Sequence, residues 1–178
     1  MDGTMNVLLA GFGGQGILFA GKVMAYAGLM DGKEISWLPS YGPEMRGGTC
    51  NCSVVVSDRS IGSPLVTNPD VLIAMNLPSL DKFVDAVVPG GTIIVDSSVV
   101  EKKVERTDVT VYYVPATKLA DENGLKGLAN IILVGKLFKE KGFVSAESLD
   151  AGLLKCVPPT KAAMIDANRT ALKLGAEE

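Results

Sequence analysis

The stretch VLLAGFGGQGILFAGKVMAYAGL, residues 7–29, decides the fold, because an apolar run, a group of glycines and a helical pattern follow one another in it. Residues 7–10 read as a buried strand, and residues 16–30 read as a helix with small and apolar side chains at helical spacing. The glycines from Gly11 to Gly16 allow the tight turn that joins the two. A strand, a turn and a helix in this order are typical of the opening unit of an α/β sheet.

The rest of the chain alternates short apolar strands with helices. Further strands are predicted at residues 33–38, 49–57, 71–75, 92–95 and 109–114, and further helices at residues 78–88, 119–123, 128–141, 146–156 and 160–174. No helix lies between the second and third strands, so part of the sheet is expected to be antiparallel. The sequence therefore predicts a single α/β domain over residues 1–178, with three α/β/α layers, a mostly parallel (mixed) sheet and a Rossmann-like arrangement.

Composition limits the classes of function. The formal net charge is −3 and charged residues make up 21% of the chain, which provides no basic surface for nucleic acid or for an anionic membrane. Gln15 and Lys22 interrupt the first apolar region before it could span a bilayer, and we expect a cytoplasmic protein. The chain has no histidine, the commonest general base and metal ligand, and this disfavours a self-contained hydrolase.

The three cysteines form neither a convincing disulfide framework nor a four-ligand metal site. Cys50 and Cys52 are two residues apart in a predicted strand, and Cys156 is distant in sequence. Reduced thiols in the core are one interpretation. A metal held by the Cys50–Cys52 pair with ligands from elsewhere is the alternative, because alternate residues of a strand share a face. We predict no metal site in this chain.

The glycine turn matches G-x-G-x-x-G through Gly11, Gly13 and Gly16, with Gly14 and Gln15 between them. Such a turn can place backbone N–H groups against a pyrophosphate, but a dinucleotide site also needs an acidic side chain at the end of the second strand. Glu34 lies instead at the start of that strand. Three interpretations stay open: a turn that serves packing alone, a nicotinamide or flavin dinucleotide site, or a site for an anionic group of a partner or another cofactor. The amide of Gln15 favours the third, because it can donate to a phosphate or to another subunit's backbone.

The loop SYGPEMRGG, residues 40–48, follows the second strand and is expected beside the glycine turn, at the carboxyl ends of the strands. Arg46 could hold a carboxylate or a phosphate, or could pair with Glu44 within the loop. Asn76 follows the strand at residues 71–75. Its amide either lies at the same edge of the sheet as the two loops or caps the next helix. Besides the glycine turn and Asn76, the candidate binding residues are Ser40, Tyr41, Gly42, Pro43, Glu44, Arg46, Gly47 and Gly48. No catalytic residue is predicted.

Several motifs together resemble a known family. They are GFGGQGI, SYGPEMRGGTCNCSVVVSD, IGSPLV, NPDVLIAMN and GGTIIVDSS, and they cover most of residues 11–98. With them the chain resembles, over nearly its whole length, the gamma subunit of 2-oxoacid:ferredoxin oxidoreductases. The pyruvate type usually carries FGPERRG where this chain has YGPEMRG at residues 41–47. The chain is therefore more similar to the 2-oxoglutarate or branched-chain oxoacid type.

The resemblance implies an enzyme that decarboxylates a 2-oxoacid on thiamine diphosphate, passes electrons through iron–sulfur clusters to ferredoxin, and transfers the acyl group to coenzyme A. Thiamine diphosphate, magnesium and the clusters would be held by other subunits, and this chain alone would bind no cofactor. Its partners would be alpha and beta subunits, with a delta subunit as a further partner. In isolation, the chain could form a homodimer. The competing hypothesis is a free-standing dinucleotide-binding oxidoreductase or ligand-sensing module that uses the G-x-G-x-x-G turn.

Overall fold

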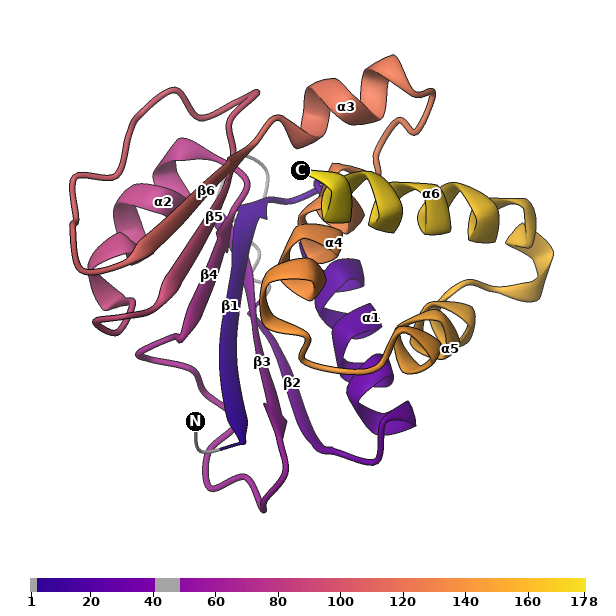
Figure 1. Cartoon of the computed structure of the whole chain (residues 1–178), viewed down its shortest axis with the longest axis horizontal. Coiled ribbons are helices and arrows are strands. Elements are labelled where there is room, and N and C mark those ends of the chain that lie inside the picture. The colour runs from indigo at the N-terminus through magenta and orange to yellow at the C-terminus, as the bar shows by residue number, and fades with distance from the viewer. Residues whose placement is uncertain (1–2, 41–48) are drawn as a thin grey trace.

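The computed structural model describes residues 3–40 and 49–178, and within these residues the strands form one 6-stranded sheet in the order β2-β3-β1-β4-β5-β6 (Figure 1). β1 pairs in parallel with β4, β4 with β5, and β5 with β6, whereas β3 is antiparallel to both β1 and β2. The predicted mixed, mostly parallel sheet is confirmed. The strands are β1 (Thr4–Phe12), β2 (Glu34–Ser40), β3 (Thr49–Ser57), β4 (Val71–Ala74), β5 (Thr92–Asp96) and β6 (Thr110–Val114).

Helices cover both faces of the sheet, which confirms the three-layer arrangement (Figure 1). On one face α1 (Ile17–Met30) and α4 (Ala129–Lys141) contact the strands, while α5 (Ala146–Cys156) packs on α1 and α6 (Ala163–Glu177) packs on α4. The other face carries α2 (Leu77–Phe83) and a 3-10 helix (Val84–Ala86). The remaining helical segments are α3 (Ala116–Glu122) and a 3-10 turn (Pro159–Lys161). None of the helices in the described residues is long and apolar enough to cross a membrane.

The core has one part on each side of the sheet. Side chains of β4 alternate between them: Val71 and Ile73 belong to the larger cluster under α1 and α4, whereas Leu72 and Ala74 belong to the smaller cluster under α2. All four residues of β4 are buried. A strand covered on both faces needs apolar side chains at every position, which explains the continuous VLIA run.

Glycines bring the outer helices against the inner ones at two crossings. A Cβ built on Gly175 of α6 would collide with the carbonyl oxygen of Ile132 in α4, and one built on Gly135 of α4 would collide with the carbonyl oxygen of Leu172 in α6. Gly152 of α5 approaches the backbone of Ala27 in α1 in the same way. The helix backbones touch here because these positions have no side chain, and any larger residue would force the helices apart.

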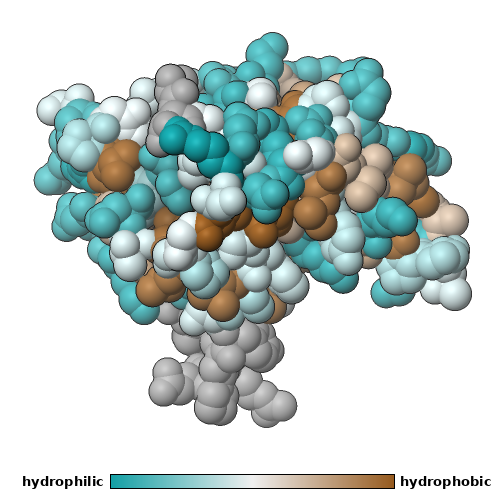
Figure 2. All heavy atoms as spheres, turned by 90° about the horizontal axis from the view of Figure 1, so that it is seen from below, coloured by the Kyte–Doolittle hydropathy of each residue, from teal (hydrophilic) through white to brown (hydrophobic). Residues whose placement is uncertain are grey.

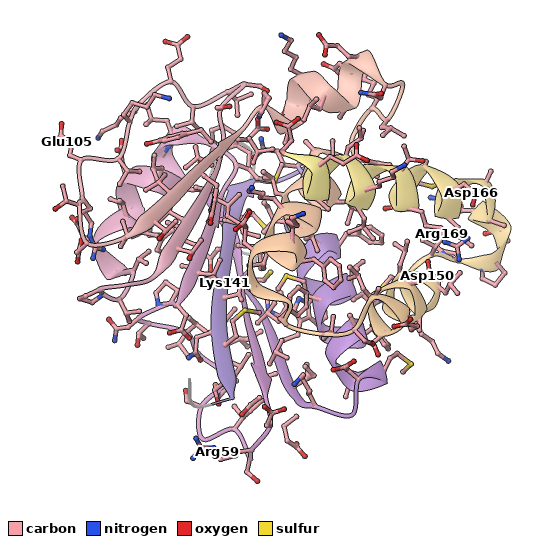
Figure 3. The ribbon with its side chains drawn as sticks, in the orientation of Figure 1. Arg59, Glu105, Lys141, Asp150, Asp166 and Arg169 are labelled. Carbon is pink, nitrogen blue, oxygen red and sulfur yellow. The ribbon has the colours of Figure 1, made fainter. Side chains whose placement is uncertain are left out.

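An ion pair joins the two outer helices. The Arg169 guanidinium of α6 donates from Nε to Asp150 Oδ1 at 2.6 Å and from Nη2 to Asp150 Oδ2 at 2.7 Å (Figure 3). The Arg169 side chain also holds the pKa of the Asp150 carboxyl below its usual value. Both side chains are partly exposed to solvent, so this pair adds little stability beyond the packing of the helices.

Several element boundaries differ from the predicted ones by a few residues, and two of these differences have a clear physical reason. β2 continues through Pro39 to Ser40, where we expected it to end before the proline; β2 is an edge strand, and an edge strand tolerates a residue without an N–H group. The helix after β4 ends at Phe83 instead of continuing to Val88. Arg106 Nη1 donates to the carbonyls of Val84 at 2.8 Å and Val87 at 2.7 Å, so these carbonyls bond to a side chain.

The chain's single tryptophan lies where β2 packs on α1. Trp37 is close to the position that a Cβ on Gly21 would occupy, and the Cys52 sulfur lies at the same place. Cys50 and Cys52 are both buried and free, on the face of β3 that packs against the helices. Burial raises the pKa of the Cys52 thiol to about 12. The two thiols are therefore protonated at neutral pH, as the core interpretation requires.

A buried lysine of α4 contacts the edge strand β6. Lys136 of α4 is 5% exposed, and its Nζ lies 2.7 Å from Glu140 Oε1 and 4.3 Å from the ring centroid of Tyr112 in β6. The Tyr112 hydroxyl donates to Glu140 Oε2 at 2.7 Å. A buried cation is tolerated when it is paired, and Glu140 supplies that pair.

Acid is expected to weaken the interaction of Glu140 with Lys136 and Tyr112. Hydrogen bonds from Lys136 and then from Tyr112 hold the pKa of the Glu140 carboxyl below its usual value. A carboxyl with a lowered folded-state pKa stabilises the protein above its ordinary pKa of about 4.3 and loses that contribution as the pH falls through the lowered value. We expect the free energy of unfolding, measured by urea titration, to fall less from about pH 6 to about pH 3 in Glu140→Gln than in the wild type. The exposed Glu101→Gln variant should follow the wild type, and equal pH slopes for Glu140→Gln and the wild type would contradict the assignment.

Candidate functional site

The chain connections run in opposite directions along the sheet on the two sides of the β1–β4 pair. These neighbouring strands are parallel, but the chain leaves β1 toward α1 on one face and leaves β4 toward α2 on the other (Figure 1). Such a switch point opens a crevice at the carboxyl ends of the strands, and ligands of α/β proteins bind there. The glycine turn borders this point on one side and Asn76 borders it on the other.

The glycine turn ends in an uncapped helix start. Gly14 has φ 96° and Gly16 has φ 74°, conformations that favour glycine. Among residues 3–40 and 49–178 no side chain caps α1, and the first turn of α1 has no acidic residue. By contrast α5 is capped by Ser145 and carries Glu147 in its first turn. Within the described part of the chain, the first N–H groups of α1 therefore have no side-chain acceptor, an arrangement that favours an anion.

Gln15 bridges the two sides of the switch point. Its Oε1 accepts a hydrogen bond from the Phe12 N–H at 2.6 Å, and its Nε2 donates to the Met75 carbonyl at 2.9 Å. A Cβ on Gly11 would lie 2.6 Å from Gln15 Oε1, so Gly11 serves the packing of this turn. A primary amide has two hydrogens, and within the described part of the chain Gln15 Nε2 uses one of them. The predicted donation of Gln15 to a phosphate or partner concerns that second hydrogen and stays a prediction.

Asn76 takes one of its two predicted roles, the helix cap, and its role at the rim stays a prediction. Its Oδ1 accepts a hydrogen bond from the Ser79 N–H at 2.8 Å, and so Asn76 caps α2. The residue is 3% exposed, and its Nδ2 has no hydrogen-bond partner among the described residues. A buried donor without a partner is costly, so this amide group is a candidate contact for whatever lies at the rim.

Sequence reasoning missed one residue at the turn, Asn130 of α4. Its Nδ2 donates to the Gly16 carbonyl at 2.9 Å across a separation of 114 residues. The only signal in the sequence is an asparagine within the otherwise apolar run LANIILV, residues 128–134. Polar residues in such a run are usually buried with a partner, but the pattern does not say which partner.

The second predicted loop begins on the same rim. Ser40 at the end of β2 pairs with Asn51, and Asn51 pairs with Ala10 near the end of β1. Only β3 lies between β2 and β1, so their carboxyl ends are roughly 10 Å apart at the usual strand spacing. The candidates Tyr41, Gly42, Pro43, Glu44, Arg46, Gly47 and Gly48 lie outside the described residues.

The strand order disfavours the dinucleotide alternative. In a dinucleotide site the second strand lies beside the first, and its end carries the acid that binds the ribose. Here β3 separates β2 from β1. Glu34 pairs with Ser57, at the end of β2 that is opposite to Ser40.

A cavity lies at the opposite rim, where β1 and β4 begin. Its apolar floor includes Met5, Val56, Val71 and Phe143. In Figure 2, a view from this side, brown apolar surface crosses the middle between hydrophilic margins. Charged groups at the margin pair locally, as in the 2.7 Å contact between the Lys33 ammonium and Asp58 Oδ1. We assign no ligand to this cavity.

Two archaeal proteins are similar to this chain in sequence. The subunit VorA of ketoisovalerate oxidoreductase from Methanothermobacter thermautotrophicus is 40% identical over 173 residues, which is 97% of this chain and 36% of that protein. The subunit KorC of 2-oxoglutarate synthase from Methanocaldococcus jannaschii is 41% identical over 86% of this chain and 83% of its own length. This chain thus spans about a third of the length of VorA and most of KorC.

Similarity extends to a solved structure and to a family of sequences. The crystal structure of the gamma subunit of a keto/oxoacid ferredoxin oxidoreductase from Geobacter sulfurreducens superimposes with a TM-score of 0.83 at 31% identity, over 97% of this chain and 96% of that one. Residues 6–178 match the family described as pyruvate ferredoxin/flavodoxin oxidoreductase. The chain therefore belongs to the pyruvate ferredoxin/flavodoxin oxidoreductase family.

Proposed function

We propose that this chain is the gamma subunit of a multisubunit 2-oxoacid:ferredoxin oxidoreductase, which converts a 2-oxoacid to an acyl-coenzyme A and reduces ferredoxin. The observation that carries the proposal is the switch-point rim, where an uncapped helix start and the end of β2 lie on one edge of the sheet. Family membership supports it. The complex would work in the cytoplasm, and the net charge of −3 fits a protein that binds neither nucleic acid nor membrane.

The substrate would be 2-oxoglutarate or a branched-chain 2-oxoacid. KorC and VorA, whose names refer to 2-oxoglutarate and ketoisovalerate, are 41% and 40% identical to this chain. The common gamma subunit of the pyruvate/ketoisovalerate oxidoreductases of Thermococcus litoralis is 28% identical. The YGPEMRG sequence at residues 41–47 points to the same types.

Within the complex, alpha and beta subunits, with delta as a further partner, would bind thiamine diphosphate, magnesium and the iron–sulfur clusters. Those groups supply the decarboxylation and the electron transfer. This chain would line and complete the site. The N–H groups at the start of α1 and the second hydrogen of Gln15 Nε2 would hold the anionic tail of coenzyme A, and Tyr41 and Arg46, predicted from the sequence as binding residues, would contribute to the same site. Water excluded from the site strengthens each of these hydrogen bonds.

A charge placed on the turn tests this role. Gly13 is exposed, and aspartate and asparagine have the same shape there but differ in charge. In the complex reconstituted with its partner subunits, Gly13→Asp is expected to raise the KM for coenzyme A about tenfold, because a carboxylate repels the anionic tail. Gly13→Asn should change this KM less than about twofold, since no charge is added. If both variants changed the KM equally, the turn would not bind the anionic tail of coenzyme A.

The competing hypothesis predicts a different result for the isolated chain. A free-standing dinucleotide-binding protein would bind NAD(H), NADP(H) or FAD saturably in the micromolar range. Calorimetric titration of the chain alone with each dinucleotide makes the comparison. We expect no saturable heat, because β3 separates β2 from β1 and Glu34 lies at the opposite rim.

A further inference from the structure

We infer that Asn130 is a positioning residue for the glycine turn, and that it sets the direction of the first N–H group of α1 toward the rim. The inference rests on the proposed function, in which this turn receives the anionic tail of coenzyme A. Asn130 touches the backbone of the turn and acts through it. It is therefore distinct from the residues that would contact the ligand directly.

The hydrogen bond acts on a rigid unit. Asn130 Nδ2 donates to the Gly16 carbonyl at 2.9 Å, and this carbonyl also accepts the first helical hydrogen bond of α1, from the Ala20 N–H at 3.0 Å. The Gly16 carbonyl and the Ile17 N–H belong to the same planar peptide group. Holding the carbonyl from two directions therefore fixes the direction of the Ile17 N–H, the first donor of the helix.

Packing allows Asn130 to hold this geometry. The residue is 3% exposed, and a Cβ on Gly16 would lie 2.5 Å from its Nδ2 and 3.6 Å from its Oδ1. The whole amide thus lies against the turn. A glycine with φ 74° can adopt several conformations at little cost, so the turn needs an external contact to select one.

Two further observations indicate that this contact serves more than packing. Asn130 Oδ1 is buried and has no hydrogen-bond partner among the described residues, and a buried unpaired amide oxygen is costly, so packing alone does not account for an asparagine here. α4 begins next to α1, and like α1 it has no side-chain cap and no acidic residue in its first turn. Two helix starts without carboxylates therefore meet at the Gly16–Asn130 contact, where their dipoles favour an anion.

Replacement of Asn130 by aspartate removes the donor and keeps the shape. In the reconstituted complex, Asn130→Asp is expected to raise the KM for coenzyme A at least about tenfold and to change kcat less than about threefold, because a carboxylate cannot donate to the Gly16 carbonyl and repels an anion. The dissociation constant of coenzyme A, measured by calorimetry on the complex, should rise with the KM. If Asn130→Asp does not assemble, Asn130→Ala gives the same measurement without the added charge.

Asn168 of α6 provides a matched control. It is 0% exposed, its Nδ2 donates to the Met164 carbonyl at 2.7 Å, and its Oδ1 also has no partner among the described residues. Its hydrogen bond lies within its own helix, away from the turn. Asn168→Asp is expected to lower the melting temperature as much as Asn130→Asp does and to leave the KM for coenzyme A unchanged.

The outcomes separate this inference from the proposed function. An unchanged KM in Asn130→Asp, with the expected increase in Gly13→Asp, would overturn the role of Asn130 alone. Unchanged values in both variants would overturn the proposed site. If Asn168→Asp raised the KM as much as Asn130→Asp does, loss of stability would explain the increase in both variants. This result would also overturn the inference.

Discussion

The isolated chain is expected to fold but to reduce no viologen dye when it is supplied with a 2-oxoacid and coenzyme A. In the proposed function, the residues around the rim would bind and shape a site whose reactive groups other subunits supply. The Asp96 side chain at the end of β5 is buried, and its oxygens accept hydrogen bonds from the Ser98 N–H and the Thr117 hydroxyl, so they are engaged within the protein. Burial raises the pKa of the Cys50 and Cys52 thiols, which leaves them protonated and weakly nucleophilic.

Addition of the alpha and beta subunits should restore the reaction. In a titration of these subunits with the chain, dye reduction is expected to rise from background and to reach a plateau at a fixed ratio. Circular dichroism of the isolated chain provides the control, because it separates an inactive folded protein from an unfolded one. Robust reduction by the chain alone would contradict the assignment, as would full activity of the other subunits in its absence.

Substitution of Gly175 by valine is expected to cause the largest loss of stability. Any Cβ at this position would collide with the Ile132 carbonyl and would lie 2.9 Å from the Lys136 backbone nitrogen. Both atoms belong to the backbone of α4, which cannot rotate away as a side chain can, so α6 must move off α4. Overpacking of this kind costs about 3 kcal/mol. For a chain of this size that corresponds to a fall of roughly 10 °C in Tm.

Gly62 is the control for this substitution. It is also a glycine, but a Cβ built on it has no neighbour within 4 Å. Gly62→Ala is expected to change the free energy of unfolding by less than about 1 kcal/mol, with stabilisation as the direction, because alanine restricts the unfolded chain. The free energies come from urea titrations of the isolated chain. A Gly175→Val protein as stable as the wild type would show that α6 can be displaced at no cost.

Much of the fold could be predicted because its signals are local. The VLIA run of β4 is apolar at every position and the TIIV run of β5 is apolar after Thr92, since both faces of these strands are covered. The absence of a helix between β2 and β3 predicts their antiparallel pairing. The strand order is a different matter, because nothing near β3 in sequence indicates that it lies between β1 and β2. The approaches of Gly135 to Leu172 and of Gly175 to Ile132 are equally non-local, since they join α4 to α6, two helices that are not consecutive in the chain.

The candidate site was predictable to the level of its rim but not of its hydrogen bonds. The glycine turn and Asn76 lie where strand ends and helix starts require them to lie. The sequence predicts that the Gln15 amide donates to a phosphate or a partner, but nothing in it indicates that Gln15 also bonds to the Phe12 N–H and the Met75 carbonyl, two backbone groups that need partners once the turn is closed. The partner of Asn130 is 114 residues away, and such a contact leaves no trace in local periodicity.

The placement of Trp37 gives this protein a built-in optical reporter. It is the only indole in the chain, it belongs to the strand that leads to the rim, and a thiol lies against it. Sulfur quenches indole emission at contact, so a shift of β2 relative to α1 changes the intensity. If a partner subunit binds at the rim as proposed and shifts β2, the tryptophan emission is expected to change, and the binding could be followed in real time without an added label.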